Sequence, residues 1–255
     1  MDVFTVDRGF PIFLSLGGTV LGASFACFFS HNLTKTKSGL LVASAAGMMI
    51  GCSLVLIAES AQRTSVPQSI LSVFVGIALM AGVDRLCSDF LNETAFHFSG
   101  VSSKQSVRVL VMLLGLVVHS VGEGLSLGLS AADSFSSTGS IVASSLAVHN
   151  VPETAALLIS FRAKGLSETV SVLFAIFSNL PQSLVAIPAL RFFSSNAEII
   201  KYGMGVSSGC MLYAVVEDIF PEAEKLLGRR SAVGHSLLGA VVIIVFDIYS
   251  HIQIR

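Results

Sequence analysis

The hydrophobic pattern divides the chain into eight long apolar runs that are separated by short polar segments. A helix that spans a bilayer needs about 20 mostly apolar residues, and each run approaches or exceeds that length. The runs are too long for the strands of a membrane barrel, so helices are expected. The pattern predicts an all-α polytopic membrane protein, a single bundle of eight transmembrane helices that takes up residues 1–255. The predicted helices cover residues 10–30, 39–58, 65–85, 107–130, 138–161, 166–190, 202–222 and 231–250.

The composition supports a membrane protein and argues against a nucleic-acid partner. Hydrophobic residues make up 53% of the chain and charged residues 12%, and the mean hydropathy is +0.81. This is too little polar surface for a soluble domain of 255 residues. The net charge is -1, whereas nucleic-acid binding needs Lys and Arg concentrated on one face. The lipid bilayer is therefore the predicted environment.

The basic residues between the runs predict the orientation of the bundle, because cytoplasmic loops carry an excess of Lys and Arg. With eight spans, ten basic residues fall on one side and five on the other. The larger group consists of Lys35, Lys37, Arg85, Lys104, Arg108, Arg162, Lys164, Lys225, Arg229 and Arg230, and the smaller of Arg8, Arg63, Arg191, Lys201 and Arg255. The larger group is expected in the cytoplasm, with both termini extracellular or lumenal. The choice between the plasma membrane and an organelle membrane stays open.

Two similar motifs interrupt the fourth and fifth runs, His119-Ser-Val-Gly-Glu123 and His149-Asn-Val-Pro-Glu153. Residues four apart lie on the same face of a helix, so each run presents one imidazole and one carboxylate in the same direction. A short connection joins the two runs, and consecutive helices are usually neighbours. We therefore expect two histidines and two carboxylates to meet across one gap.

Burial of these carboxylates calls for a compensating charge. An ionised acid at the centre of a spanning helix is penalised by about 3 kcal/mol, and the only basic residue in the two runs, Arg108, lies at the start of the fourth run, eleven positions before His119. A divalent cation would supply the charge, since imidazole and carboxylate together suit zinc, iron or manganese. The alternative is that the carboxylates are protonated and hydrogen-bonded. This explanation would have to hold for both His–Glu pairs, which share the same spacing and the same depth in the membrane.

Neighbouring residues in the two runs fit this interpretation. Pro152 removes a backbone donor and frees a carbonyl one turn earlier, which predicts a kink. Asn150 adds an amide oxygen. Gly122, Gly124 and Gly128 form a small-residue strip, for which ordinary close packing of membrane helices is a sufficient explanation.

The paired motifs, in the fourth and fifth of eight runs, resemble the ZIP (Zrt/Irt-like) family of divalent metal transporters. The resemblance implies import of zinc, with iron or manganese as alternatives, into the cytoplasm as a transported substrate, without a prosthetic group. It also implies that His119, Glu123, His149 and Glu153 are metal ligands, that the glutamates can bridge two ions, and that Asn150 serves the second ion. A homodimer is compatible with the resemblance, and the sequence does not decide the oligomeric state.

The chain departs from the family pattern at two positions. Ser120 stands where the family often has Asn, and Gln182 stands in the sixth helix where the family often has a glutamate. Gln182 lowers the negative charge of a second metal site, and Ser120 is a poorer ligand for it than Asn. We therefore expect one bound ion, and the sequence does not decide whether a second ion binds. On the seventh helix, Glu217 is expected to assist an ion on its way to the cytoplasm, together with Asp218 and Glu222. The alternative is that these acids are solvated or paired with Lys225.

An intramembrane serine hydrolase is the main alternative function. Gly124-Leu-Ser126-Leu-Gly128 fits the G-x-S-x-G pattern of a nucleophilic serine, and His119 lies on the same face. However, such a serine occupies a strained turn between a strand and a helix, whereas Ser126 lies within a helical run. A base two turns away, about 10 Å along the helix axis, cannot reach the hydroxyl proton. The sequence therefore predicts a transporter and not an enzyme.

Two further kinds of site are weakly supported. A membrane di-iron oxidase would use more ligands, with Glu-x-x-His spacing. The four cysteines, Cys27, Cys52, Cys87 and Cys210, show no metal or redox spacing and are interpreted as small apolar fillers.

Overall fold

The structure, a computed structural model, describes residues 6–30, 34–92, 98, 100–132, 137–193 and 197–253. Within these ranges every regular element is helical. The elements are α1 (Val6–Ser30), α2 (Lys35–Arg63), α3 (Val66–Asn92), α4 (Ser103–Ala132), α5 (Ser137–Ala163), α6 (Glu168–Pro188), the π-helical segment η1 (Ala189–Phe193), α7 (Ala197–Ala214), the π-helical segment η2 (Val215–Ile219), α8 (Phe220–Leu227) and α9 (Arg229–Gln253).

Over the described residues these elements join into eight continuous helical segments, one for each predicted span. The segment η1 extends α6, and α7, η2 and α8 follow one another without a break. Gly228 has a φ of 78°, a left-handed conformation that ends α8 and redirects the chain into α9. The expected all-α polytopic fold is thereby confirmed.

Among the described helices, five are long and apolar enough to cross a bilayer. These segments are Lys35–Arg63, Val66–Leu86, Gln105–Gly128, Glu168–Arg191 and Arg229–Tyr249, and α1 adds the shorter apolar segment Ile12–Phe28. Large apolar side chains face outward, as shown by Phe28 at 77% exposure and Leu71 at 64%. Buried positions include many Ser, Thr, His, Glu, Asn and Gln side chains. An apolar exterior around a polar centre is what a bilayer environment favours.

The glycine strip of α4 holds this helix directly against its neighbours. A Cβ atom built on Gly124 would collide with the backbone carbonyl of Gln182 in α6, and one on Gly128 would collide with the carbonyl of Ala186. On the other side, a Cβ on Gly122 would lie 3.1 Å from the Cα of Ser207 in α7. The packing role expected for these glycines is confirmed. These close contacts hold α4 in a fixed position between α6 and α7.

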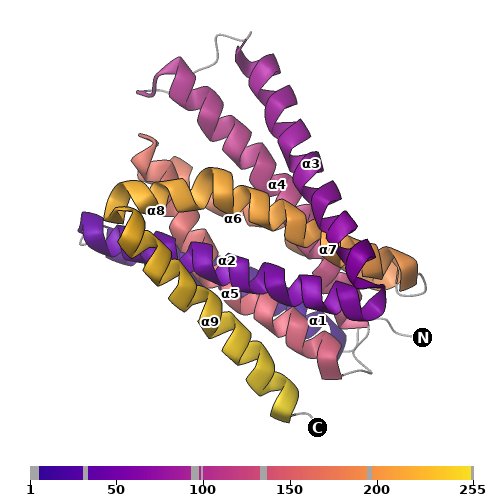
Figure 1. Ribbon diagram of the computed structural model, residues 1–255. Coiled ribbons are helices and arrows are strands. Elements are labelled where there is room, and N and C mark those ends of the chain that lie inside the picture. Colours follow the sequence, from indigo (N-terminus) through magenta and orange to yellow (C-terminus); the bar gives the residue numbers. More distant parts are fainter. Residues whose placement is uncertain are drawn as a thin grey trace.

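The helix α5 lies inside the bundle, between α1 and α2, and it also contacts α4 and α6. Gly22 of α1 permits the close approach, because a Cβ there would collide with the carbonyl of Val151. The helix remains continuous through Pro152. Figure 1 shows α2 and α9 running side by side, with α5 behind α2. The two helices that carry the paired motifs therefore contact each other and several further helices of the chain.

Candidate metal centre

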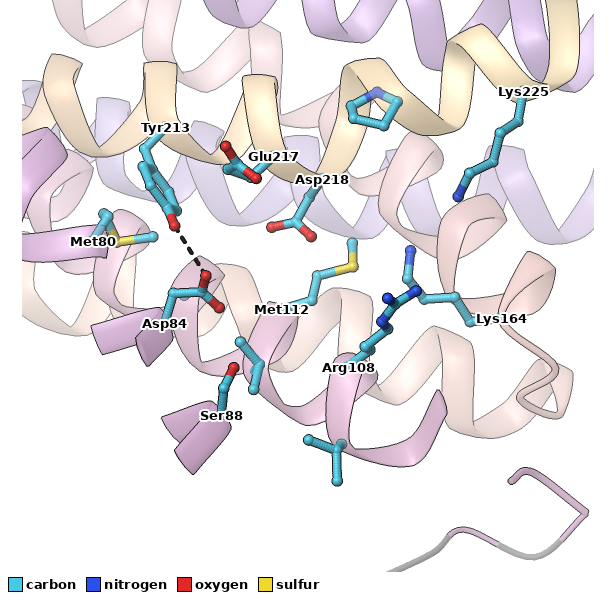
Figure 2. Close-up of a pocket in the computed structure, with 14 residues that line it drawn as sticks. Met80, Asp84, Ser88, Arg108, Met112, Lys164, Tyr213, Glu217, Asp218 and Lys225 are labelled. Atoms are coloured by element: carbon cyan, nitrogen blue, oxygen red, sulfur yellow. Dashed lines mark hydrogen bonds between the residues drawn. The ribbon is translucent and has the colours of Figure 1, made fainter. Parts of the chain in front are cut away.

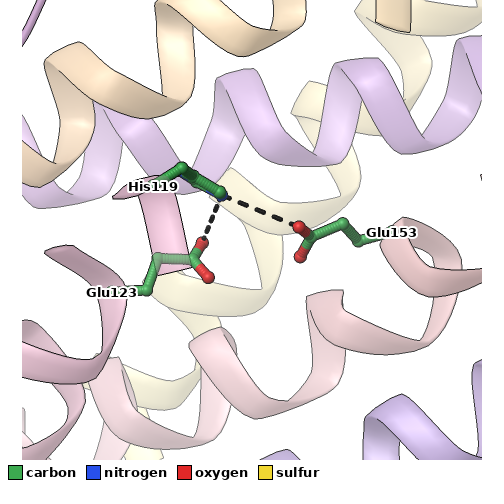
Figure 3. A group of neighbouring side chains, drawn as sticks. All are labelled: His119, Glu123 and Glu153. Carbon is green, nitrogen blue, oxygen red and sulfur yellow. Dashed lines mark ion pairs between the residues drawn. The ribbon is translucent and has the colours of Figure 1, made fainter. Parts of the chain in front are cut away.

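The four side chains of the paired motifs converge between α4 and α5. Nε2 of His149 lies 2.9 Å from Oε1 of Glu123 and 3.3 Å from Oε2 of Glu153. Nε2 of His119 lies 3.3 Å from Oε1 of Glu123 and 3.7 Å from Oε1 of Glu153. Figure 3 shows the imidazole of His119 between the two carboxylates. The helical spacing thus places all four groups around one point, as the sequence predicts.

This cluster is closed off from the surroundings and is short of hydrogen-bond partners. All four side chains are at most 1% exposed. Among the described residues, both ring nitrogens of His119, one carboxylate oxygen of Glu123 and both of Glu153 form no hydrogen bond. Buried polar atoms are nearly always paired, because an unsatisfied one costs about 1–3 kcal/mol and a charged one more. His119, Glu123 and Glu153 offer ligand atoms within 4.8 Å of one another, a group that could hold a metal ion.

A neutral hydrogen-bonded network lies beside the cluster. The Ser15 hydroxyl of α1 donates to Oε1 of Gln182 at 2.7 Å, and the Asn150 amide donates to Oγ of Ser15 at 2.8 Å and to Oε1 of Gln182 at 2.5 Å. The network continues through Thr154, which donates to the Asn150 carbonyl and accepts from Asn179. The two predicted amide ligands are therefore bonded to each other and to α1.

The contribution of α1 could not be read from the sequence. Ser15 is separated from Gln182 by 167 positions. Serine is common in membrane helices, and no motif distinguishes Ser15 from the other serines of the chain. The part that Ser15 plays becomes visible only from the packing of α1 against α5 and α6.

Cys52 of α2 is a further neighbour that the sequence analysis did not single out. Its thiol is 3% exposed and lies within hydrogen-bonding reach of the His149 imidazole. A cysteine in a small-residue helix gives no pattern from which this contact could be predicted. The contact adds a sulfur atom next to the His149 imidazole.

Glu217 does not join the central cluster and instead lines a separate cavity of about 430 Å³. Asp84 of α3, Asp218 of η2 and the basic side chains Arg108, Lys164 and Lys225 line the same cavity (Figure 2). The Tyr213 hydroxyl donates to Asp84 at 3.0 Å. At its inner end the cavity is lined by Met112 and Gly115 of α4, and Gly115 is four residues, about 6 Å, before His119.

The structure gives no support to the serine hydrolase. Ser126 lies within the unbroken helix α4, is 0% exposed, and its hydroxyl forms no hydrogen bond. A nucleophilic serine needs a base within hydrogen-bond reach. In the part of the chain that the structure describes, the hydroxyl of Ser126 has no such neighbour.

The fold and the cluster together define a class of protein, an integral membrane protein whose centre holds side chains suited to a metal ion. The chain belongs to the ZIP zinc transporter family, whose family model matches residues 97–246. This range includes both paired motifs. The family is one of metal ion transporters.

Three relatives illustrate the similarity. A predicted zinc transporter of Arabidopsis thaliana is 28% identical over 200 residues, which cover 78% of this chain and 32% of the relative. The zinc transporter GufA of Myxococcus xanthus is 24% identical over 183 residues, 71% of this chain and 72% of the relative. The zinc transporter ZIPB of Bordetella bronchiseptica is 27% identical over 238 residues, 89% of this chain and 76% of the relative. The matched part thus spans about a third of the plant relative and about three quarters of the bacterial ones.

Proposed function

We propose that the chain carries zinc across a membrane into the cytoplasm, and that one zinc ion binds His119, Glu123, His149 and Glu153. The observation that carries this proposal is the set of buried imidazole and carboxylate atoms that converge in the cluster, most of them without a hydrogen bond among the described residues. Such atoms are costly unless something binds them, and a cation satisfies imidazole and carboxylate atoms together. The membrane-protein fold and the relatives named as zinc transporters agree with a transported ion.

Charge balance favours a single divalent ion. Two ionised glutamates and two neutral histidines carry a formal charge of minus two, which one divalent cation neutralises. The adjacent network of Ser15, Asn150 and Gln182 contributes amide and hydroxyl groups and no further charge. A second divalent ion would therefore leave a net positive charge in a low-dielectric interior, which is unfavourable.

The surrounding atoms favour zinc over harder ions. Zinc binds imidazole, carboxylate and thiolate groups, whereas manganese prefers oxygen ligands. His119 and His149 supply nitrogen, and Cys52 places a sulfur atom at the edge of the cluster. Iron(II) remains the alternative substrate with similar ligand preferences.

The cavity that contains Glu217 provides the route between the cluster and one face of the membrane. Its inner end lies about one helical turn from His119 on α4. Three of its lining side chains, Arg108, Lys164 and Lys225, belong to the group of basic residues expected in the cytoplasm. On this assignment the cavity opens to the cytoplasm, both termini are extracellular or lumenal, and Glu217 and Asp218 guide the departing ion.

Metal influx into liposomes tests this function. Purified protein would be reconstituted, and the influx of zinc, iron and manganese compared for the wild type and His149→Ala. His235→Ala is a matched control, because His235 lies on α9 and bonds to the backbone carbonyl of Ser231. We expect zinc influx that His149→Ala abolishes and His235→Ala preserves. Equal flux through the wild type and His149→Ala would refute the site.

A further inference from the structure

The turn between α5 and α6 delivers a lysine to the cavity described above. The backbone N–H of Lys164 donates to the carbonyls of Ser160 and Phe161, each at 3.2 Å, and Leu166 N–H donates to Phe161 at 3.3 Å. Gly165 has a φ of 94°, which allows the tight reversal. These bonds hold the backbone of Lys164 in place. Its ammonium enters the cavity from the end of α5, the helix that also carries His149 and Glu153 (Figure 2).

The cavity contains equal numbers of acidic and basic side chains. The carboxylates are Asp84, Glu217 and Asp218, and the cations are Arg108, Lys164 and Lys225. Without the cations, a group of three carboxylates within one partly enclosed space would attract and retain a divalent ion. With them, the formal charge of the lining residues is zero.

Lys164 is the basic residue best placed to offset the carboxylates inside the cavity. Lys225 is 70% exposed and its ammonium lies 3.4 Å from the neighbouring Glu222. Arg108 is exposed at the start of α4. Lys164 is only partly exposed, and within the described residues no carboxylate oxygen lies within 4 Å of its ammonium. Its charge is therefore directed into the space that a departing ion would cross.

The pKa of Lys164 agrees with an ammonium that lacks a close partner. Burial lowers the pKa of Lys164 below its usual range, and the nearby positive charges of Lys225 and Arg108 lower it further. Glu222 and Asp218 raise it without cancelling the effect of burial. A divalent cation in the same space would add a further repulsion.

We propose that Lys164 acts as a tethered counter-cation that keeps the cavity from retaining the transported metal ion. The ammonium lies close enough to Asp218 and Glu222 to offset part of their negative charge, so an ion that leaves the central cluster enters a cavity with weak affinity and passes into solution. This role deepens the proposed function, because it assumes that the cavity is the path by which the ion leaves. Lys164 is on this view a positioning residue for release, and it is not a ligand.

Calorimetric titration of the purified full chain with zinc separates this proposal from the central site. We expect one binding event in the wild type. Lys164→Gln should add a second, weaker event, because loss of one positive charge should tighten zinc binding in the cavity on the order of tenfold. Asp218→Asn in the Lys164→Gln background should remove the added event, and His149→Ala in that background should remove the central event alone.

Two further variants distinguish charge from structure. Lys164→Arg keeps the positive charge and should bind and transport zinc as the wild type does, whereas Lys164→Gln should lower the maximal influx several-fold with a lower KM. Lys225→Gln is the matched control and should add no event, because that ammonium is exposed and paired with Glu222. The proposal is overturned if Lys164→Gln adds no event, or if Lys164→Arg behaves like Lys164→Gln. If the central site is wrongly assigned, His149→Ala will instead leave every zinc-binding event in place.

Discussion

Nε2 of His149 lies 2.9 Å from Oε1 of Glu123, across the interface between α5 and α4. The same oxygen lies 3.3 Å from Nε2 of His119, so one carboxylate of α4 approaches both imidazoles. Glu153 of α5 likewise approaches both imidazoles, at 3.3 Å from His149 and 3.7 Å from His119. Each carboxylate therefore contacts both histidines, so the two motifs form a single cluster and not two.

Glu123→Gln should weaken zinc binding while leaving the metal-free protein at least as stable as the wild type. Loss of an outer partner of a metal ligand costs about 10–100-fold in affinity, so loss of a ligand should cost at least as much. In the metal-free state the change removes a buried carboxylate that has no compensating cation, which should not lower stability. Thermal unfolding with chelator and with excess zinc measures both effects.

In that experiment, wild-type protein at 100 times its zinc dissociation constant should gain about 2.7 kcal/mol of unfolding free energy. Glu123→Gln should gain far less at the same zinc concentration. Glu168→Gln is a suitable control, because Glu168 lies in the first turn of α6 and is partly exposed. A metal-free Glu123→Gln protein that unfolds well below the wild type would argue for a structural role of this carboxylate.

Gln182→Glu should raise the zinc stoichiometry from one to two. The amide oxygen of Gln182 accepts hydrogen bonds from Ser15 and Asn150, and a carboxylate can accept both. The added negative charge lies beside Asn150 and would offset a second cation. Equilibrium dialysis with zinc counts the bound ions. A stoichiometry of one in a folded Gln182→Glu protein would contradict this account of why a single ion binds.

Cys52→Ser should reduce the preference for zinc over manganese. The substitution keeps the size of the side chain but replaces a soft sulfur atom with a hydroxyl oxygen next to His149. Competition between zinc and manganese for uptake into liposomes measures the ratio, which should fall by about tenfold if the sulfur contributes around 1.4 kcal/mol to the discrimination. Cys210→Ser, which alters a thiol near the Gly76 carbonyl, should leave the ratio unchanged.

Gly124→Ala should destabilise the bundle by about 1–3 kcal/mol, the usual cost of overpacking a close contact. The new methyl group would meet the backbone carbonyl of Gln182, which cannot move without shifting α6. Gly82→Ala should have little effect, because among the described residues no atom beyond its own stretch of helix lies within 4 Å of a Cβ at that position. Unfolding by sodium dodecyl sulfate or heat, followed for both variants, gives the comparison.

The helices and the central cluster were predictable because each depends on local spacing. Long apolar runs identify spanning helices, and His119 and Glu123 share a face because four residues make about one helical turn. The same holds for His149 and Glu153. Adjacency of the two helices followed from the short connection between them.

The surroundings of the cluster depend on helix packing, and the sequence does not determine it. Ser15 and Cys52 reach the site from α1 and α2, and neither belongs to a motif. Lys164 lies in a turn where a basic residue is expected for orientation alone, so its entry into the cavity was not predictable. Contacts between distant segments need the tertiary structure.

The burial of the central cluster has a consequence for the speed of the protein. His119, Glu123, His149 and Glu153 are at most 1% exposed, so this conformation is an occluded one, closed to water on both sides. An ion bound there can neither arrive nor depart until helices separate, and collective motions of that kind take microseconds to milliseconds. Under the proposed function, helix movement therefore limits the rate of the transport cycle, and stronger ligands would prolong the time that the ion stays bound without making the cycle faster.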